Sequence, residues 1–501
     1  MSARHPTAQP FRLAEVVERL ERAGLLVTRP AADPMLTGIA DDSRRVQRGE
    51  LFCAWAGTTA DAHAFVPVAE SAGAAAALVE RPVDGSELPQ VVVRDGRRAA
   101  ALAAALAYGD PAAEMMLIGV TGTNGKTTTV WLLRHLLGAR HAAASLGTLG
   151  AILDDGRPLP GSDSLTTPGP VELARTLRAL RDRGTQALAA EVSSHALEQG
   201  RVYALHFDAA IFINLTRDHL DYHGTEEAYR AAKRSLVERL RPDGVAVVNA
   251  EDPAWTGLAE QAPRALRFAL TAADADVRAE EVVLGAFGAR FRLLTPVGAV
   301  PVELPLLGAF NVQNALAAAA ACHALGLGLD EIAERLHTVP QVPGRLERIA
   351  DAPCPVLTDY AHKPYALEQA LRALRPLVPG RLILVFGAGG ERDRGKRPMM
   401  GAVAERLADI AIVTSDNPRT EDPEAIIDEI VAGMPRGDYI RIPDRRAAIA
   451  RALGSARAED MVLLAGKGHE TYQIVGKQKI PFDEREVVRK LLADGVREVT
   501  A

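Results

Sequence analysis

The sequence predicts an α/β protein built from three domains, and three observations support this. With 501 residues the chain is too long for one hydrophobic core, because single cores stop growing near about 250–300 residues. Two long stretches alternate short apolar runs with helical patterns, which is typical of parallel sheets covered by helices. Breaker residues separate the stretches at Gly109-Asp110-Pro111 and near Val342–Pro343. We therefore expect domains at residues 1–111, 112–342 and 343–501.

The N-terminal domain is expected to be a small α/β unit. Residues 11–23 have helical periodicity, and 74–80 and 89–95 are short apolar runs of the kind that form buried strands. The alanine-rich segment 97–108 is a predicted helix, and the Gly-Asp-Pro sequence after it ends that helix.

The central domain is expected to contain a parallel sheet of the P-loop ATPase kind. The apolar strand 116–120 runs into a Gly/Thr loop and a predicted helix at 127–137. Further predicted strands, separated by helical patterns, cover 186–192, 209–215 and 244–250. Between 277 and 302 the pattern changes to short strands with turns, which indicates an antiparallel flap, and a helix begins within 308–327.

The C-terminal domain is expected to be a second, separate, Rossmann-like doubly wound sheet. Its predicted strands cover 354–360, 381–387, 410–416 and 460–466. Its predicted helices cover 364–376, 398–407 and 423–432.

Composition excludes several classes of protein. A hydrophobic fraction of 48% with 24% charged residues argues against disorder, and a net charge of −6 argues against a nucleic-acid partner. The cysteines at 53, 322 and 354 are too scattered for a disulfide framework or a zinc ribbon. Apolar runs such as 99–108 are too short to span a bilayer, and residues 1–12 lack a signal-peptide core. We expect a cytoplasmic monomer without a membrane span.

The strongest local signal is the glycine-rich sequence from Gly119 to Thr128. A strand leads into this turn, whose backbone N–H groups can point at phosphate, and the following helix adds the positive end of its dipole. Lys126 would reach the outer phosphates, and the Thr127 hydroxyl would bind Mg²⁺. The general P-loop pattern places a glycine where this chain has Val120, so the loop is a shorter variant. The alternative is a tight strand–helix turn without a ligand.

Two further strand ends carry candidate metal ligands. Glu191 closes the strand 186–192, and the segment after 209–215 contains Asp218, His219, Asp221 and His223. Ligands of such sheets gather at the carboxyl ends of the strands, so Glu191 and His219 are candidates for binding Mg²⁺. The alternative for the second segment is a solvated polar loop.

Lysine is scarce, since it supplies only eight of the 58 basic residues. Unlike arginine, it offers a compact charge or a titratable amine, so each lysine is a candidate functional residue, although codon bias alone also explains the scarcity. By composition alone Lys233 would be a solvated lysine on a helix face.

Three polar loops follow strand ends of the C-terminal domain, where an open α/β sheet forms its binding crevice. The first holds Arg392, Arg394, Lys396 and Arg397, the second covers 414–423 and the third 465–473. The guanidinium group suits a carboxylate or a phosphate. The alternative is three polar surface loops without a ligand.

Together these motifs resemble the Mur ligases, which are ATP-dependent amide-bond-forming enzymes of bacterial cell-wall synthesis. The resemblance covers all three domains in the order of the family. It rests on GTNGKTT (122–128), TTP (166–168), EVSSHAL (191–197), NLTRDHLDYHG (214–224), GAFNVQN (308–314), GRLE (344–347), DYAHKP (359–364), GGERDRGKRP (389–398), DNPR (416–419) and AGKGHE (465–470).

Within the family, the resemblance points to the ligases that add the third peptide residue, meso-2,6-diaminopimelate, to UDP-N-acetylmuramoyl-L-alanyl-D-glutamate. It implies that ATP converts the D-glutamyl carboxylate into an acyl phosphate, which the incoming amine attacks. The ATP-binding residues that it implies are Gly122, Thr123, Asn124, Gly125, Lys126, Thr127, Thr128 and Asn311.

The resemblance also implies a metal site and a modified lysine. Mg²⁺ would be held by Thr127 and Glu191, with a second ion near His219. Lys233 would be carbamylated to N6-carboxylysine, which turns an amine into a carboxylate-like group on the metal side. With Lys126, these residues form the implied catalytic set.

The resemblance also implies binding residues for the nucleotide sugar and for diaminopimelate. Those for the nucleotide sugar are Asp41, Ser43, Thr166, Thr167, Ser193, Gln199 and Arg201, with Thr58, Thr59 and Ala60 as further candidates in a loop that departs from the family pattern. Those for diaminopimelate are Arg392, Asp416, Asn417, Pro418, Arg419, Gly466 and Glu470. Diaminopimelate is lysine with a distal carboxylate, for which Arg419 offers a bidentate partner, and Glu470 would bind the distal ammonium.

Four alternatives remain. A lysine-adding ligase of the same type is disfavoured because a buried arginine would then be unpaired. A folylpolyglutamate synthase is disfavoured because it lacks such an N-terminal domain and the DNPR segment, and the other Mur ligases are disfavoured by the DNPR and EVSSHAL segments. A non-catalytic nucleotide-binding protein would be expected to have lost one of Thr127, Glu191, His219 or Lys233, and all four are present.

Overall fold

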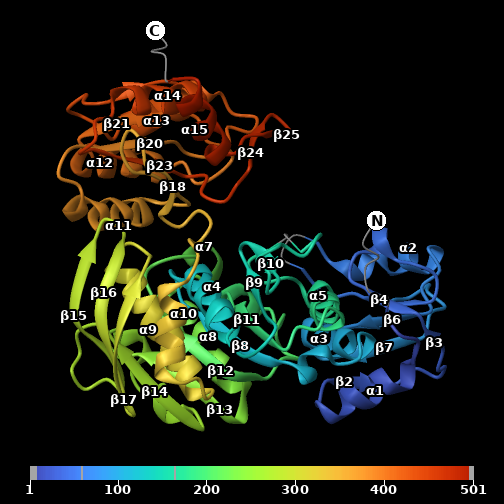
Figure 1. Cartoon of the computed structure of the whole chain (residues 1–501). Coiled ribbons are helices and arrows are strands. Elements are labelled where there is room, and N and C mark those ends of the chain that lie inside the picture. Colours follow the sequence, from blue (N-terminus) through green and yellow to red (C-terminus); the bar gives the residue numbers. More distant parts are fainter. Residues whose placement is uncertain (1–7, 58–59, 163–164, 496–501) are drawn as a thin grey trace. The chain divides into compact units, whose positions relative to one another are not determined.

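The computed structural model describes residues 8–57, 60–162 and 165–495. The chain forms two compact units (Figure 1). The first combines 1–280 with 293–300 and 313–336, and the second combines 281–292, 301–312 and 337–501. Helices cover largely parallel sheets in both units, which confirms the predicted α/β class.

A five-stranded sheet forms the N-terminal part of the first unit, with the strand order β2-β7-β6-β5-β4. Its strands are β2 (Leu26–Thr28), β4 (Gly38–Ala40), β5 (Glu50–Cys53), β6 (Ala76–Val79) and β7 (Gln90–Val93). Strands β4 to β7 are parallel, and β2 is an antiparallel edge. Because side chains alternate along β5, Leu51 and Cys53 pack against α1 (Leu13–Arg22) and α3 (Gly96–Ala107), whereas Phe52 faces α2 (Val66–Ser71).

The first predicted helix begins later than its periodicity indicates. Phe11 and Arg12 form β1 (Phe11–Arg12), which pairs with β3 (Met35–Leu36). Arg12 then serves as the N-cap of α1, where its backbone N–H donates to the Glu15 carboxylate at 2.7 Å.

The central sheet has ten strands in the order β10-β9-β11-β8-β12-β13-β14-β15-β16-β17. Six strands lie side by side in the middle of this sheet. They are β8 (Met116–Thr121), β9 (Ala143–Gly147), β11 (Ala187–Glu191), β12 (Phe207–Phe212), β13 (Leu240–Asn249) and β14 (Arg264–Ala269). They pair in parallel, as predicted, and β10 (Gly150–Ile152) is an antiparallel edge. The predicted flap corresponds to β15 (Val277–Gly285), β16 (Gly288–Thr295) and β17 (Gly298–Leu304).

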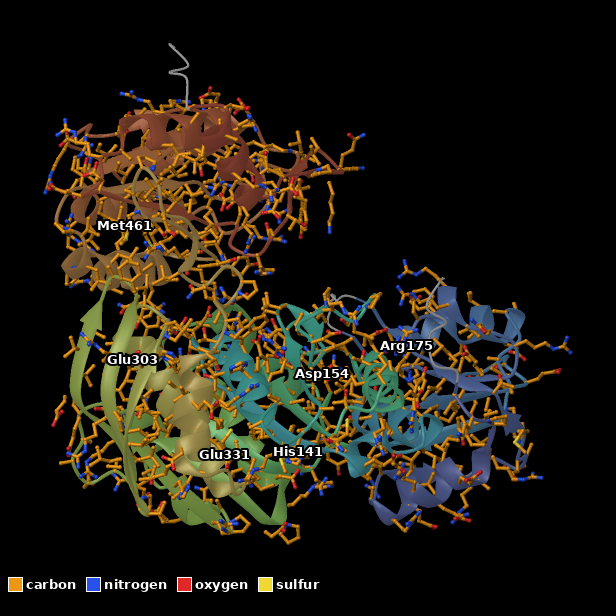
Figure 2. All side chains as sticks on the ribbon, in the orientation of Figure 1. His141, Asp154, Arg175, Glu303, Glu331 and Met461 are labelled. Atoms are coloured by element: carbon orange, nitrogen blue, oxygen red, sulfur yellow. The ribbon has the colours of Figure 1, made fainter. Side chains whose placement is uncertain are left out.

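The helices of this region are α4 (Lys126–Leu137), α5 (Pro170–Asp182), α6 (Ser194–Glu198), α7 (Leu220–His223), α8 (Glu226–Arg234), α9 (Ala309–Ala324) and α10 (Leu329–His337). Helix α4 packs on β9 and β11, whereas α5 covers the other face with Leu173, Leu177 and Leu180. Helix α5 also contacts α3, and its Arg175 lies toward the N-terminal sheet (Figure 2). The N-terminal sheet and the parallel part of the central sheet are therefore joined through α3 and α5.

The second unit contains a six-stranded sheet in the order β18-β19-β23-β20-β21-β22. Its strands are β18 (Glu347–Ala350), β19 (Val356–Asp359), β20 (Leu382–Phe386), β21 (Ile410–Val413), β22 (Ile440–Arg441) and β23 (Met461–Ala465). All are parallel except β18. Helices α11 (Pro364–Leu374), α12 (Lys396–Leu407) and α13 (Pro423–Val431) cover one face, and α14 (Arg445–Ser455) and α15 (Glu484–Ala493) cover the other. This doubly wound arrangement agrees with the prediction.

One small sheet of the second unit has no counterpart in the prediction. Strands β24 (Tyr472–Val475) and β25 (Gln478–Pro481) form an antiparallel hairpin after β23. Elsewhere, Cys53, Cys322 and Cys354 are buried free thiols. Among the described residues, no helix has both the length and the apolar character needed to cross a bilayer.

A buried ion pair holds α14 to α15. Arg445 Nε donates to Glu484 at 2.8 Å, Thr358 Oγ1 donates to the same carboxylate at 2.7 Å, and both charged side chains are fully buried. Removing one partner of a buried pair leaves the other charge uncompensated. We therefore predict that Glu484→Gln destabilises the second unit by about 3–5 kcal/mol. Hydrogen exchange in β23 during urea titration measures this, and Glu486→Gln, at an exposed position of the same helix, should cost less than about 0.5 kcal/mol.

Candidate functional site

The glycine-rich loop lies at the carboxyl edge of the central sheet, between two neighbouring strands. Its strand, β8, is paired with β11 on one side and β12 on the other, so the ends of all three strands meet there. The N–H of Thr123 donates to the Asn214 carbonyl at 2.8 Å, and the N–H of Asn124 donates to Asn214 Oδ1 at 2.9 Å. Gly125 has φ +84°, and a side chain there would collide with Asn314 Oδ1. The loop is therefore held rigidly just before α4 begins at Lys126.

Two lysine side chains converge on one carbonyl oxygen of this loop. Lys126 Nζ donates to the carbonyls of Gly122 at 2.8 Å and Thr123 at 3.0 Å, and Lys233 Nζ donates to Gly122 at 2.7 Å. Lys233 is only 2% exposed, so the composition-based expectation of a solvated helix-face lysine is wrong. Burial, with the nearby charge of Lys126, lowers the pKa of Lys233 well below its ordinary value. A buried amine with a lowered pKa spends more time neutral, which is its nucleophilic form.

The Tyr229 side chain connects Lys233 to the glycine-rich loop. Its hydroxyl lies 3.1 Å from Thr123 Oγ1, and Lys233 Nζ lies 4.8 Å from the centre of its ring. Sequence reasoning missed Tyr229, but its place one helical turn before Lys233 on α8 was a usable signal.

Glu191 is buried at the end of β11 and its carboxylate is fixed by one neighbour. The Thr148 N–H donates to Glu191 Oε1 at 2.9 Å, and the Thr148 hydroxyl lies 3.3 Å from Oε2. A Cβ at position 147 would lie 2.2 Å from Glu191 Oε1, so a larger residue there would displace the carboxylate. The sequence did not predict a role for Thr148, because it lies in a turn without a recognisable motif.

His219 belongs to a cluster of rings beside this edge of the sheet. Its ring lies 4.8 Å from that of His195 and 6.3 Å from that of Tyr229, and its backbone has φ +53°. Burial and the neighbouring His219 and His223 lower the pKa of His195 to about 4, so His195 is neutral at pH 7. The histidines of this cluster are partly exposed, so a cation can reach their rings from this edge.

These donors suit a hard divalent cation. The Thr127 hydroxyl and the Glu191 carboxylate are oxygen ligands that Mg²⁺ accepts, usually together with phosphate oxygens and water. Within the described residues, no group of three His, Cys, Asp or Glu side chains is arranged to hold a metal ion. A metal ion at this edge would therefore depend on the hydroxyl of Thr127, on substrate oxygens or on a modified Lys233.

The residues expected to bind a nucleotide sugar in the central domain form one hydrogen-bonded chain beside Glu191. Thr167 Oγ1 donates to the Glu191 carbonyl at 2.8 Å and accepts from the Ser193 N–H at 3.1 Å. Arg201 donates to the Thr167 carbonyl at 2.8 Å and to Gln199 Oε1 at 2.7 Å. Thr166 Oγ1 lies 3.3 Å from Thr148 Oγ1.

The N-terminal candidates approach the same region. A Cβ at Gly169, two residues after Thr167, would lie 3.7 Å from Asp41 Oδ2. Ser43 begins the short 3₁₀ helix Ser43–Arg45, capped by Asp42. Thr58 and Thr59 lie outside the described residues. Asn311, the remaining candidate of the nucleotide set, is buried near the start of α9 and donates to the Leu307 carbonyl at 2.8 Å.

In the second unit, the segments 416–419 and 466–470 meet around a buried lysine. Lys467 Nζ lies 3.2 Å from both Asn417 Oδ1 and Glu470 Oε2, and 3.7 Å from Asp416 Oδ1. Asn417 Nδ2 donates to Glu470 Oε2 at 2.9 Å. Gly466 is needed because a Cβ there would lie 2.5 Å from Asp416 Oδ2. Sequence reasoning quoted the AGKGHE motif but missed Lys467 as the residue that joins the two segments.

Arg419 is held in an unusual backbone conformation by the β24–β25 hairpin. Its φ is +53°, its N–H donates to the Ile474 carbonyl at 3.0 Å, and its carbonyl accepts from the Gly476 N–H at 2.7 Å. A left-handed conformation is unfavourable for arginine, so the surrounding structure imposes it. Arg419 Nη1 donates to the Gly390 carbonyl at 2.6 Å, and the side chain is half-buried.

The four cationic residues after β20 differ in role, and Lys396 and Arg397 lie in the first turn of α12, not in the predicted loop. Arg397 is fully buried and donates to Glu421 and Glu429 at 2.9 Å, Arg394 pairs with Glu429, and Lys396 donates to the His362 carbonyl at 2.8 Å. Arg397 and Lys396 therefore stabilise the fold, whereas Arg394 forms an ion pair at the surface. Arg392 is exposed and lies beside Gly389, where a Cβ would be 3.7 Å from Arg392 Cγ and 3.1 Å from Arg419 Nη1. Arg392 and Arg419 therefore flank the same backbone position.

Two family models match the chain: "Mur ligase middle domain" at residues 120–322 and "Mur ligase, glutamate ligase domain" at 344–468. The UDP-N-acetylmuramoyl-L-alanyl-D-glutamate–2,6-diaminopimelate ligase of Geobacillus kaustophilus (strain HTA426) is 45% identical over 469 residues, which cover 91% of this chain and 95% of the relative. A solved structure of another UDP-N-acetylmuramoyl-L-alanyl-D-glutamate–2,6-diaminopimelate ligase is 35% identical, has a TM-score of 0.69, and is matched over 92% of this chain and 96% of its own. Mycobacterium tuberculosis folylpolyglutamate synthase shares the fold at 20% identity, with a TM-score of 0.62 and coverage of 74% of this chain and 92% of its own.

Proposed function

Because this chain belongs to the Mur ligase family, we propose that it is an ATP-dependent, ADP-forming ligase of peptidoglycan precursor synthesis. It joins meso-2,6-diaminopimelate to UDP-N-acetylmuramoyl-L-alanyl-D-glutamate. The observation that carries this function is 45% identity to the diaminopimelate ligase of Geobacillus kaustophilus over 91% of the chain. The rival folylpolyglutamate synthase is similar in fold over only 74% of the chain.

The residues at the edge of the central sheet support a phosphoryl-transfer step. We propose that the loop 122–125 and the start of α4 bind the phosphates of ATP, with Lys126 on the outer phosphates and Asn311 as a further ATP-binding residue. The D-glutamyl carboxylate takes the γ-phosphoryl group and releases ADP, and the resulting acyl phosphate is attacked by an amine of diaminopimelate with loss of phosphate. Bound Mg²⁺, held by Thr127, Glu191 and His219, would neutralise the phosphate charge during this transfer. The chain's own contribution is to position the two substrates and to stabilise negative charge.

We also propose that Lys233 is carbamylated in the active protein. In the unmodified state two lysine side chains donate to one buried carbonyl oxygen, an arrangement that like-charge repulsion disfavours whenever both amines are protonated. Carbamylation consumes a neutral amine and carbon dioxide, releases a proton and leaves an anion beside Lys126. The attraction of that anion to Lys126 replaces the repulsion and provides an oxygen ligand for a cation.

The remaining substrate sites follow the geometry within each unit. We propose that the chain Thr166, Thr167, Ser193, Gln199 and Arg201, together with Asp41 and Ser43, binds the nucleotide sugar. Diaminopimelate would bind where the segments 416–419 and 466–470 meet, with Arg419 and Arg392 on its distal carboxylate and Glu470 on its distal ammonium.

We further propose the division into domains at 1–111, 112–342 and 343–501, which the three separate main sheets support. A cytoplasmic monomer fits this function, because ATP and nucleotide-linked precursors are cytoplasmic metabolites.

ADP release tests the function directly. We predict release only when the nucleotide-linked dipeptide and meso-diaminopimelate are both supplied with Mg²⁺-ATP, because the acyl phosphate must form and then be captured. L-lysine should support at most about a hundredth of the rate, since it would leave the arginine at the distal carboxylate unpaired. A coupled assay for ADP, with mass spectrometry of the tripeptide product, measures both. Equal turnover with L-lysine would contradict the specificity, and no product with any amino acid would contradict the ligase function.

A further inference from the structure

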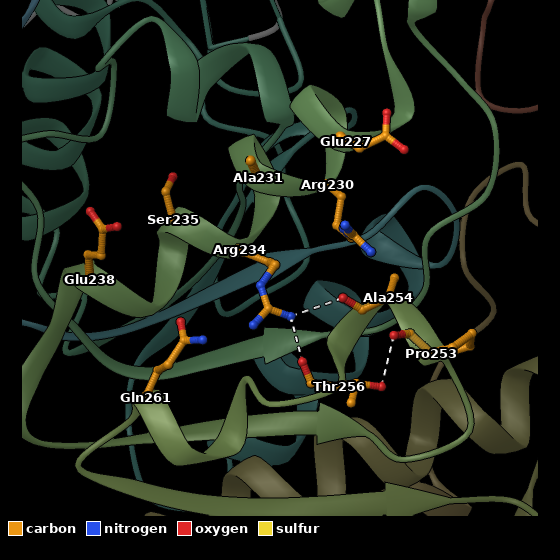
Figure 3. A pocket seen from close by; sticks show the side chains of 10 residues that line it. All are labelled: Glu227, Arg230, Ala231, Arg234, Ser235, Glu238, Pro253, Ala254, Thr256 and Gln261. Atoms are coloured by element: carbon orange, nitrogen blue, oxygen red, sulfur yellow. Dashed lines mark hydrogen bonds between the residues drawn. The ribbon is translucent and has the colours of Figure 1, made fainter.

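A groove of about 630 Å³ lies on the outer face of α8, the helix that carries Lys233 (Figure 3). It is lined by Glu227, Arg230, Ala231, Arg234, Ser235, Glu238, Pro253, Ala254, Thr256 and Gln261. Lys233 is buried and turned to the glycine-rich loop, whereas its helical neighbours line the groove. The groove shares no residue with the ATP, nucleotide-sugar or diaminopimelate sites proposed above, so it is a separate cavity of a size typical for small ligands.

Two guanidinium groups face this groove from adjacent turns of α8. Arg230 and Arg234 are four residues apart and therefore lie on the same side of the helix. In Figure 3 both side chains extend toward the turn at 253–256, while Glu227 points away from it. Two positive groups are thus directed into one cavity.

Glu227 and Glu238 also line the groove, but among the described residues neither forms an ion pair with Arg230 or Arg234. Arg234 donates to the carbonyls of Ala254 at 3.1 Å and Thr256 at 3.0 Å, which fixes its position. Within the described ranges of the chain, neither Arg230 nor Arg234 forms an ion pair, and the guanidinium of Arg230 forms no hydrogen bond with another residue. The donors of Arg230 are therefore available to a ligand.

The geometry points to an anion-binding site, and we propose that this groove binds the phosphate group of a small phosphorylated molecule. A guanidinium presents paired N–H donors that match the oxygens of phosphate, and two of them balance a dianion. The groove is larger than one phosphate, and its other walls carry the polar side chains of Ser235, Glu238 and Gln261. These suit hydroxyl or amine groups on the rest of the molecule, so the expected ligand is a phosphorylated polyol or amine and not the free ion.

Calorimetry on the full-length protein tests the proposal. The phosphate loop is first filled with a non-hydrolysable ATP analogue and Mg²⁺, so that it cannot bind the probe. Glycerol 3-phosphate is then titrated, with inorganic phosphate as the second probe. We expect saturable binding of one glycerol 3-phosphate per chain, at least threefold tighter than inorganic phosphate.

Substitution of Arg230 tests whether its guanidinium binds the ligand. Arg230→Ala should weaken binding at least tenfold and Arg230→Glu should abolish it, and both variants should fold because Arg230 supports no other residue. Arg22→Ala, which removes one exposed cation from α1, should leave the affinity unchanged. The proposal is overturned by the absence of saturable binding, by equal affinity for the two probes, or by binding that survives Arg230→Glu.

Discussion

Lys233→Ala is expected to reduce kcat by at least about a hundredfold, which is the usual cost of removing one group that stabilises charge during group transfer. The side chain is buried, donates to Gly122 at 2.7 Å and shares that oxygen with Lys126. Its loss removes the anion that carbamylation would place there and leaves the charge of Lys126 uncompensated. Steady-state ADP release at saturating substrates measures the effect.

Three comparisons separate the carbamate from a simple ammonium role. Lys233→Arg keeps a positive charge but cannot be carbamylated under mild conditions, so it should be as inactive as the alanine variant. Added bicarbonate should not restore either variant. Lys490→Ala, at an exposed position of α15, should retain full activity. Full activity of Lys233→Arg would contradict the carbamate proposal.

The modification can also be observed without measuring activity. Intact-protein mass spectrometry with nucleotide bound should show one added carbon dioxide on the wild type and none on Lys233→Arg. Acid reverses carbamylation, because protonation of the carbamate releases carbon dioxide. Burial and Lys126 lower the pKa of the Lys233 amine, so the neutral, reactive form persists to lower pH than in an ordinary lysine. Activity should fall as pH decreases and return when pH and bicarbonate are restored.

Local sequence predicted the parts of the site that depend on consecutive residues. The strand–loop–helix from Met116 to Leu137 was expected within one or two residues, because a buried strand, a glycine turn and a helix start each leave a local signature. Glu191 was expected from its place at a strand end, and it lies beside the loop because β11 pairs with β8. Because the strands are parallel, residues that follow the ends of neighbouring strands lie close together at the same edge of the sheet.

The sequence could not predict which of the cationic side chains are buried in the fold and which are exposed to a ligand. Arg392, Arg394 and Arg397 lie within six residues of sequence, yet Arg397 is fully buried in ion pairs in α12 whereas Arg392 is exposed. From its sequence Lys467 would be expected to be a solvated loop residue, but its side chain is buried among Asn417, Glu470 and Asp416. Burial arises from contacts between distant segments, which spacing along the chain does not encode.

Arg419→Lys is the second substitution with a large expected effect. Arg419 offers a planar fork that can form two hydrogen bonds with a carboxylate, and lysine offers only a point charge. A charged hydrogen bond contributes about 1.5–3 kcal/mol, so kcat/KM for diaminopimelate should fall roughly ten- to a hundredfold. KM for ATP should remain within about twofold, because the proposed ATP site belongs to the glycine-rich loop.

The backbone of Arg419 supplies an internal control for this prediction. A backbone φ of +53° is less unfavourable for glycine than for arginine. Arg419→Gly should therefore not destabilise the second unit through its backbone. That variant should nevertheless lose diaminopimelate use at least as strongly as Arg419→Lys, which would separate recognition from folding. Arg446→Lys, at an exposed position of α14, should change neither constant. An unchanged KM for diaminopimelate in both Arg419 variants would instead assign the unfavourable conformation to the β24–β25 hairpin alone, since the hydrogen bonds of the Arg419 backbone with Ile474 and Gly476 would then be the reason that it persists.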